Sequence, residues 1–127
     1  MTVLVTGAGG FIGSNVVKKL VEQGHTVIAL DHFKIGTPDR LKGFSGAIIQ
    51  SDICTFNWES VKEGLDAVIH EAAITDTTVT DERQMLAVNT EAFARLLDFA
   101  KQARVRVVYA SSGSVYGNGS VPMRETN

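Results

Sequence analysis

The chain has 127 residues, of which 44% are hydrophobic and 20% are charged. Its 12 Lys and Arg residues nearly balance 14 Asp and Glu residues, which gives a formal net charge of −2. This balance argues against a protein that neutralises the phosphate backbone of a nucleic acid. The length suits one domain and the apolar share suits a packed core, so we expect a single folded domain over residues 1–127.

Other features of the composition argue against secreted, membrane and metal-binding proteins. The sole cysteine, Cys54, excludes a disulfide framework within the chain, and the three histidines do not cluster with acidic residues at a metal-ligand spacing. No apolar run reaches the roughly 20 residues that span a bilayer. The first residues also lack the basic start of a signal peptide. We therefore expect a cytoplasmic protein with no metal site and no membrane or nucleic-acid partner.

The first 31 residues have the pattern of a strand, a helix and a second strand. A β-branched run over 2–6 stops at Gly7, and a second apolar run over 27–30 ends at Asp31. Such runs are typical of strands buried on both faces of a parallel sheet. Apolar residues recur between them at three- and four-residue steps, which predicts an amphipathic helix before Gly24. The apolar positions of this helix are Phe11, Ile12, Val16, Val17, Leu20 and Val21.

The rest of the chain continues the alternation of strands and helices. We expect a loop over 36–46, a short helix over 57–63, a long helix over 81–102 and a Ser/Gly-rich loop from 111 onward. Further strands are expected over 47–50, 67–70 and 105–110. This alternation predicts an α/β fold, a doubly wound parallel sheet of about five strands in the order 3-2-1-4-5. The ligand crevice should lie at the carboxyl ends of the first and fourth strands.

Three glycines after the first strand have the spacing G-x-x-G-x-x-G. Gly7 allows a tight turn, Gly10 lets a pyrophosphate approach the backbone, and Gly13 lets the helix pack close to the sheet. A pyrophosphate there would meet free N–H groups and the positive end of the helix dipole. The plainer alternative is a glycine-rich turn without a ligand, but the strand–loop–helix context favours a dinucleotide site. No Gly-Lys-Ser/Thr follows, so the loop is not a Walker A motif.

Asp31 ends the second strand, 18 residues after Gly13. An acidic side chain at this point accepts hydrogen bonds from an adenosine ribose, and it favours NAD because a carboxylate repels a 2′-phosphate. A solvated turn aspartate is the alternative. His32, Lys34 and Arg40 are close enough in sequence to offset the repulsion, so NADP is kept as the second candidate cofactor.

Further motifs follow in order at fitting intervals. They are Ser51-Asp52-Ile53, His70-Glu71-Ala72-Ala73, Asn89 and the segment 109–117, Tyr-Ala-Ser-Ser-Gly-Ser-Val-Tyr-Gly. Together with the glycine spacing and Asp31, they resemble the extended short-chain dehydrogenase/reductases, the family of nucleotide-sugar epimerases and dehydratases. The resemblance implies a Rossmann-type cofactor domain, a nucleotide-sugar substrate, transient hydride transfer from a sugar carbon to nicotinamide, and a homodimer formed through the helix 81–102.

The resemblance also assigns cofactor-binding roles to single residues. Asp52 and Ile53 would flank the adenine, with a plain core position as the alternative for Ile53. Residues 72–73 are small and would let the backbone approach the ribose and nicotinamide. Asn89 would link the active-site strand ends by hydrogen bonds, with a purely structural network as its alternative. The implied cofactor residues besides the three glycines and Asp31 are Phe11, Ile12, His32, Lys34, Asp52, Ile53, Ala72, Ala73 and Asn89.

The Ser-Ser motif carries the implied catalytic position. Ser112 matches the Ser/Thr whose hydroxyl bonds the substrate oxygen, Ser111 is the neighbouring second choice, and a turn serine is the competing interpretation. Tyr116 and Thr75 are assigned to the substrate.

The proton-transfer pair of the family, Tyr-x-x-x-Lys on a helix, does not occur within these residues. Tyr109 and Tyr116 are followed four positions later by Gly113 and Ser120. We therefore expect an N-terminal, cofactor-binding part of a larger enzyme, with the substrate portion absent, that binds dinucleotide weakly and does not turn over alone. A non-catalytic dinucleotide-binding module and an NAD(P)H-dependent reductase are the alternatives.

Overall fold

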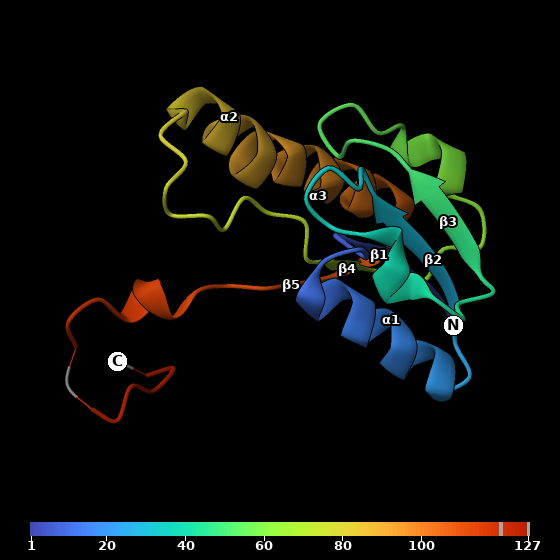
Figure 1. Cartoon of the computed structure of the whole chain (residues 1–127), viewed down its shortest axis with the longest axis horizontal. Helices are drawn as coiled ribbons and strands as arrows, with labels where there is room; N and C mark the ends of the chain where they lie inside the picture. Colours follow the sequence, from blue (N-terminus) through green and yellow to red (C-terminus); the bar gives the residue numbers. More distant parts are fainter. Residues whose placement is uncertain (120, 127) are drawn as a thin grey trace.

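A five-stranded parallel sheet forms the centre of the molecule. The computed structural model describes residues 1–119 and 121–126. The strands lie side by side in the order β3-β2-β1-β4-β5 (Figure 1), which confirms the predicted topology. Their bounds are β1 Thr2–Thr6, β2 Thr26–Asp31, β3 Ala47–Gln50, β4 Ala67–His70 and β5 Arg106–Tyr109.

The register brings the carboxyl ends of the three inner strands to one edge. Thr6, the last residue of β1, stands opposite Leu30 of β2 and His70 of β4. The loops that follow β1, β2 and β4 therefore start beside one another, where a doubly wound sheet places its ligand crevice.

Successive residues of β1 pack on opposite faces of the sheet. Val5 belongs to a buried cluster beneath α1 (Phe11–Glu22) and the 3₁₀ turn η1 (Pro38–Leu41). Leu4 belongs to a larger cluster on the other face, beneath α3 (Ala92–Ala103) and the 3₁₀ turn η2 (Trp58–Val61). Burial on both faces explains the unbroken apolar runs of the inner strands.

The long helical pattern over 81–102 folds as three joined segments. They are α2 (Glu82–Leu86), a π-helical turn η3 (Ala87–Glu91) and α3. Asp81 caps the first segment because its Oδ1 accepts a hydrogen bond from the Gln84 N–H at 3.1 Å. The prediction of a helix is confirmed, and the π-turn is a local widening that the residue pattern did not indicate.

Two helix predictions differ from the structure in detail. In α1 the buried side chains are centred on Val17, whereas Phe11, Ile12 and Val21 are exposed. Gly13 is buried against the backbone of Gly7 and Ala8, so the helix face that carries it packs inward and these three residues point away. The short helix expected over 57–63 is only the turn η2, held by the burial of Trp58 between Phe56 and Phe99.

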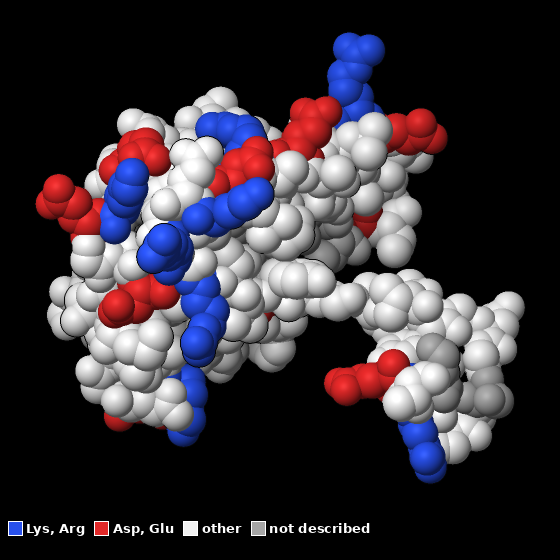
Figure 2. Space-filling view, turned by 180° about the vertical axis from the view of Figure 1, so that it is seen from behind, with Lys and Arg blue, Asp and Glu red and all other residues white. Residues whose placement is uncertain are grey.

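The segment after β5 leaves the sheet and extends away from it (Figure 1 and, from behind, Figure 2). Among the described residues of this segment, the regular element is the 3₁₀ turn η4 (Gly113–Tyr116). The strand at the opposite edge of the sheet is β3, and its Ala47, Ile48 and Gln50 are exposed. No helix in the described part of the chain has the length and apolar character needed to cross a membrane.

Two neighbouring leucines of α3 test the packing of this fold. Leu96 is fully buried, whereas 43% of Leu97 is exposed. We expect Leu96→Ala to lower the free energy of unfolding by about 2–5 kcal/mol, because it leaves a cavity beneath the sheet. Leu97→Ala should change it by only about 0.5 kcal/mol. Urea denaturation of both variants measures this, and equal losses would contradict the placement of α3.

Candidate functional site: a glycine loop at the strand ends

The glycine loop forms because Gly7 and Gly13 leave no room for a side chain and Gly10 leaves little. Gly7 has a φ of +65°, and a Cβ there would lie 2.8 Å from the Ala72 nitrogen. A Cβ on Gly13 would collide with the Gly7 carbonyl, and one on Gly10 would lie 3.1 Å from the same oxygen. The loop is thus drawn tightly between β1, the start of α1 and the segment after β4, as the glycine spacing predicts.

The start of α1 presents backbone N–H groups without a competing side chain. Gly10 is the N-cap, no side chain caps the helix, and no acidic residue stands in its first turn. The first N–H groups of a helix have no partner within it, and the helix dipole makes this end positive. Phe11 and Ile12, both predicted to contact the cofactor, lie at this end with 75% and 59% of their surfaces exposed. The arrangement suits an anionic group.

Asp31 is buried at the end of β2 and bonds the glycine loop directly. Its Oδ2 accepts a hydrogen bond from the Gly9 N–H at 2.9 Å, and its Oδ1 accepts one from the Phe33 N–H at 2.7 Å. The His32 Nδ1 lies 3.4 Å from Oδ1. The carboxylate is therefore held by two backbone donors beside the loop, rather than solvated in a turn.

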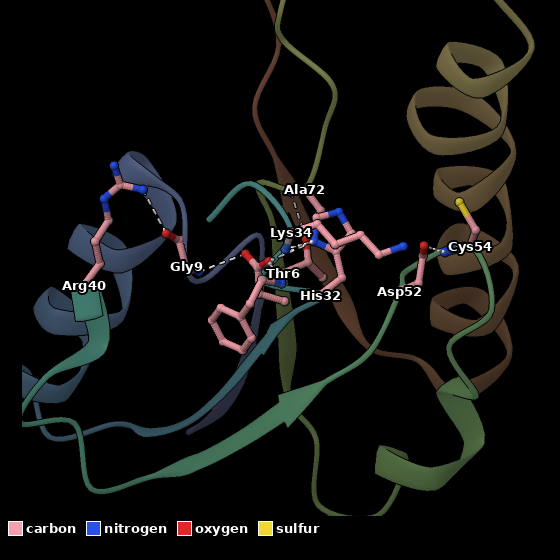
Figure 3. A network of polar contacts seen from close by, with 10 residues as sticks. Thr6, Gly9, His32, Lys34, Arg40, Asp52, Cys54 and Ala72 are labelled. Carbon is pink, nitrogen blue, oxygen red and sulfur yellow. Dashed lines mark hydrogen bonds and ion pairs between the residues drawn. The ribbon is translucent and has the colours of Figure 1, made fainter. Parts of the chain in front are cut away.

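Two residues after β2 bond Gly9, which is not part of the G-x-x-G-x-x-G spacing, and a third, Gly36, lies close against it. The Gly9 carbonyl accepts a hydrogen bond from Arg40 Nη1 at 3.1 Å (Figure 3) and another from the Thr37 N–H at 3.0 Å. A Cβ on Gly36 would lie 2.7 Å from the Gly9 carbonyl carbon. In the sequence, this contact could have been recognised from the additional glycines at 9 and 36, since each permits a close backbone approach.

Thr6 joins the ends of β1 and β4 through its hydroxyl group. The Thr6 Oγ1 accepts hydrogen bonds from the N–H groups of Glu71 and Ala72, at 3.2 and 3.1 Å. It lies 2.9 Å from the His70 Nδ1. The two N–H groups can only donate, so the Thr6 oxygen accepts from both of them. We therefore assign the hydroxyl proton to the bond with His70 Nδ1, which makes Nδ1 the acceptor and places the histidine proton on Nε2. Sequence reasoning missed Thr6 because a threonine in a strand is ordinary.

His70 is the buried partner in this network. Burial lowers the pKa of its imidazole from the ordinary value of 6.5. Its ring stacks on Phe93 at a centroid distance of 5.1 Å, and Phe93 in turn contacts Tyr109. Burial also raises the pKa of the adjacent Glu71 carboxyl. The end of β4 is thus fixed by a neutral histidine.

The loop after β4 is held by Asn89 of η3. The Asn89 Oδ1 accepts from the Ile74 N–H at 2.8 Å, and its Nδ2 donates to the Ile74 carbonyl at 3.0 Å. Both ends of the side-chain amide therefore bond one residue of this loop. Ala73 and Thr75, on either side of Ile74, are exposed. Asn89 thus links η3 to the loop that follows β4.

Two residues after β3 are predicted to flank the adenine. Asp52 is partly exposed, whereas Ile53 is buried. The Asp52 Oδ1 accepts the Cys54 N–H at 2.9 Å, and this bond lowers the pKa of the carboxyl, assisted by the charges of His32 and Lys34. Ile53 is buried in the cluster beneath α3, as in the core alternative. His32, Lys34 and Asp52 lie together in Figure 3.

The structure does not bring the Ser-Ser motif to the glycine loop. Ser111 and Ser112 are exposed on the segment that extends away from the sheet (Figure 1). The Ser112 Oγ accepts the Ser114 N–H at 3.1 Å and so caps η4, the turn that contains Tyr116. A serine in a turn commonly makes a bond of this kind.

Known proteins that match the chain share its fold. A model described as the NAD dependent epimerase/dehydratase family matches residues 3–127. ADP-L-glycero-D-manno-heptose-6-epimerase of Thiobacillus denitrificans is 38% identical over an alignment of 125 positions that covers 93% of this chain and 37% of that protein.

Two solved structures extend this comparison. The ADP-L-glycero-D-manno-heptose-6-epimerase of Helicobacter pylori has a TM-score of 0.86 and 34% identity, covering 98% of this chain and 43% of its own. The UDP-glucose-4-epimerase of Stenotrophomonas maltophila, with bound NAD and formylated UDP-arabinopyranose, has a TM-score of 0.88 and 30% identity, covering 99% and 41%. The chain spans about two fifths of the length of these relatives.

The buried His70 predicts a pH dependence of stability. Its folded-state pKa lies below 6.5, so the unfolded chain binds a proton first as the pH falls. We expect the free energy of unfolding to fall between about pH 7.5 and 5, and the difference between wild type and His70→Gln, which keeps an acceptor for Thr6, to isolate this residue. Urea denaturation across that range provides the measurement. A pH-independent difference would contradict the assignment.

Proposed function

The chain belongs to the NAD-dependent epimerase/dehydratase family, and on that premise we propose that it is the NAD(P)-binding portion of a nucleotide-sugar epimerase or dehydratase. The observation that carries the proposal is the cradle of Gly7, Gly10 and Gly13 at the uncapped start of α1. Its substrate class follows the relatives, whose names specify ADP- and UDP-linked sugars.

The residues at the strand ends fit a dinucleotide. A Cβ on any of the three glycines would occupy space against the loop backbone, so the cradle offers backbone donors and no side chain. These donors would hold the pyrophosphate, and Asp31 would face the adenosine ribose. The carboxylate of Asp31 supports NAD over NADP, because it is buried and held in place by two backbone N–H groups.

The proposed mechanism assigns separate tasks to the chain's own residues. When bound, NAD supplies the hydride acceptor for oxidation of a sugar carbon. Thr6 and His70 hold the backbone at Ala72 in place, so that small residues border the crevice. Ser112 would bond the substrate oxygen, once the segment after β5 packs against the strand ends. Thr75 and Tyr116 would contact the sugar.

A homodimer through the helices α2 and α3 is part of the proposal. Leu86 and Leu97 expose apolar surface along this side of the molecule. Burying such side chains against a second copy would remove that surface from water.

Titration with NAD tests the cofactor assignment. We expect isothermal calorimetry to detect NAD binding at millimolar concentration or below, with NADP weaker because Asp31 repels its 2′-phosphate. Gly10→Val should abolish binding while circular dichroism shows a retained fold, because its side chain fills the cradle. Gly113→Val, at a position with open space around it, is the matched control. A wild-type chain that binds neither nucleotide would refute the assignment.

The coding frame beyond Asn127 tests the enzymatic assignment. We expect a helix with Tyr-x-x-x-Lys there, since i, i+4 spacing places the general base and its lysine on one helix face. A stop codon at that point would refute the enzyme and favour a dinucleotide-binding module. Net release of NAD(P)H by the full-length product would favour the reductase.

A further inference from the structure

Arg40 takes no direct part in the proposed cofactor contacts, yet it bonds the glycine loop. Its Nη1 donates to the Gly9 carbonyl at 3.1 Å, alongside the Thr37 N–H at 3.0 Å. The Gly9 N–H donates to Asp31 Oδ2 at 2.9 Å. Both backbone polar groups of Gly9 are therefore held by residues of the segment that follows and includes the end of β2 (Figure 3).

The peptide between Gly9 and Gly10 is the unit that these bonds orient. Its carbonyl faces Arg40 and Thr37, and its N–H donates to the Gly7 carbonyl at 3.0 Å. Glycine on both sides removes the Cβ clashes that normally restrict rotation of a peptide plane. This plane is consequently free to flip unless other groups hold it. A flip would break the hydrogen bonds of the Gly9 carbonyl and of the Gly10 N–H.

The orientation of this peptide sets the start of α1. Gly10 is the N-cap, and its own carbonyl accepts the Ser14 N–H at 3.1 Å. The N–H groups proposed to receive the pyrophosphate follow directly in the first helical turn. A rotated peptide at 9–10 would displace these donors, although no side chain in the cradle had changed.

Arg40 is placed by a firmly anchored turn. It belongs to η1, where Thr37 Oγ1 accepts the Asp39 N–H at 3.2 Å and caps the turn. The next residue, Leu41, is buried in the same cluster as Ala8. In the described part of the chain, no carboxylate lies within 4.0 Å of the Arg40 guanidinium. Its bond to Gly9 is thus not diverted by an ion pair.

We propose that Arg40 is a positioning residue of the glycine loop, which locks the Gly9–Gly10 peptide and thereby orders the N–H groups that receive a dinucleotide pyrophosphate. The part concerning dinucleotide rests on the proposed function. The locking of the peptide does not, because it concerns the chain without ligand. This role also differs from a contact with a 2′-phosphate, since the guanidinium bonds the loop itself.

Amide hydrogen exchange of the ligand-free 127-residue chain tests the lock. Arg40→Ala should speed exchange of the Gly10 N–H about tenfold while the amides of β1 keep their rates. Arg40→Gln, whose side-chain amide can also donate, should restore part of the protection. Arg83→Ala, an exposed position on α2, is the matched control and should change nothing. Unchanged Gly10 exchange in Arg40→Ala would overturn the proposal.

Calorimetry with two probes tests the consequence for binding. Arg40→Ala should weaken NAD binding about tenfold and leave the affinity for adenosine, which has no pyrophosphate, unchanged. Equal losses for both probes would overturn the positioning role. Faster Gly10 exchange in a chain whose wild type binds no NAD would support the lock and refute the proposed function, so the two failures are distinguishable.

Discussion

The close approach of two backbones at the ends of β1 and β4 is the constraint on which the site depends. Gly7 turns away from β1 so near to Ala72 that a Cβ would lie 2.8 Å from the Ala72 nitrogen. The Thr6 hydroxyl accepts the Ala72 N–H, and it shares the Glu71 N–H with the Thr6 backbone carbonyl. A buried N–H group without a partner lowers stability. The close approach of the two backbones therefore requires an acceptor such as the Thr6 hydroxyl.

A site made of backbone groups follows from this constraint. The glycine loop offers N–H groups and a helix dipole, and it excludes side chains by lack of space. Such a site has few side chains to set its shape, so its geometry must come from neighbours. Asp31, Thr37 and Arg40 supply three of the bonds that fix Gly9, the first from the end of β2 and the other two from the segment after it.

Much of the fold could be predicted from residue patterns, because strands that are buried on both faces of a sheet contain recognisable apolar runs. The residues inside strands such as 2–6 and 67–70 are apolar because both faces of the sheet are covered, and the order of strands follows from right-handed crossovers. Details of helices were harder to predict. Phe11 and Ile12 fit an apolar helical face by spacing, yet they are exposed because Gly13 sets which face approaches the sheet. The π-turn in η3 has no sequence signal of its own.

The sequence by itself determined the βαβ unit, the glycine spacing and the acidic end of β2, because each depends on neighbours along the chain. Only the tertiary structure decided how Gly9 is held, since Asp31 and Arg40 are 22 and 31 residues away from it. The same holds for the bond between Thr6 and His70, 64 residues apart. Contacts of this range depend on strand register and loop path, which local patterns of residue type do not specify.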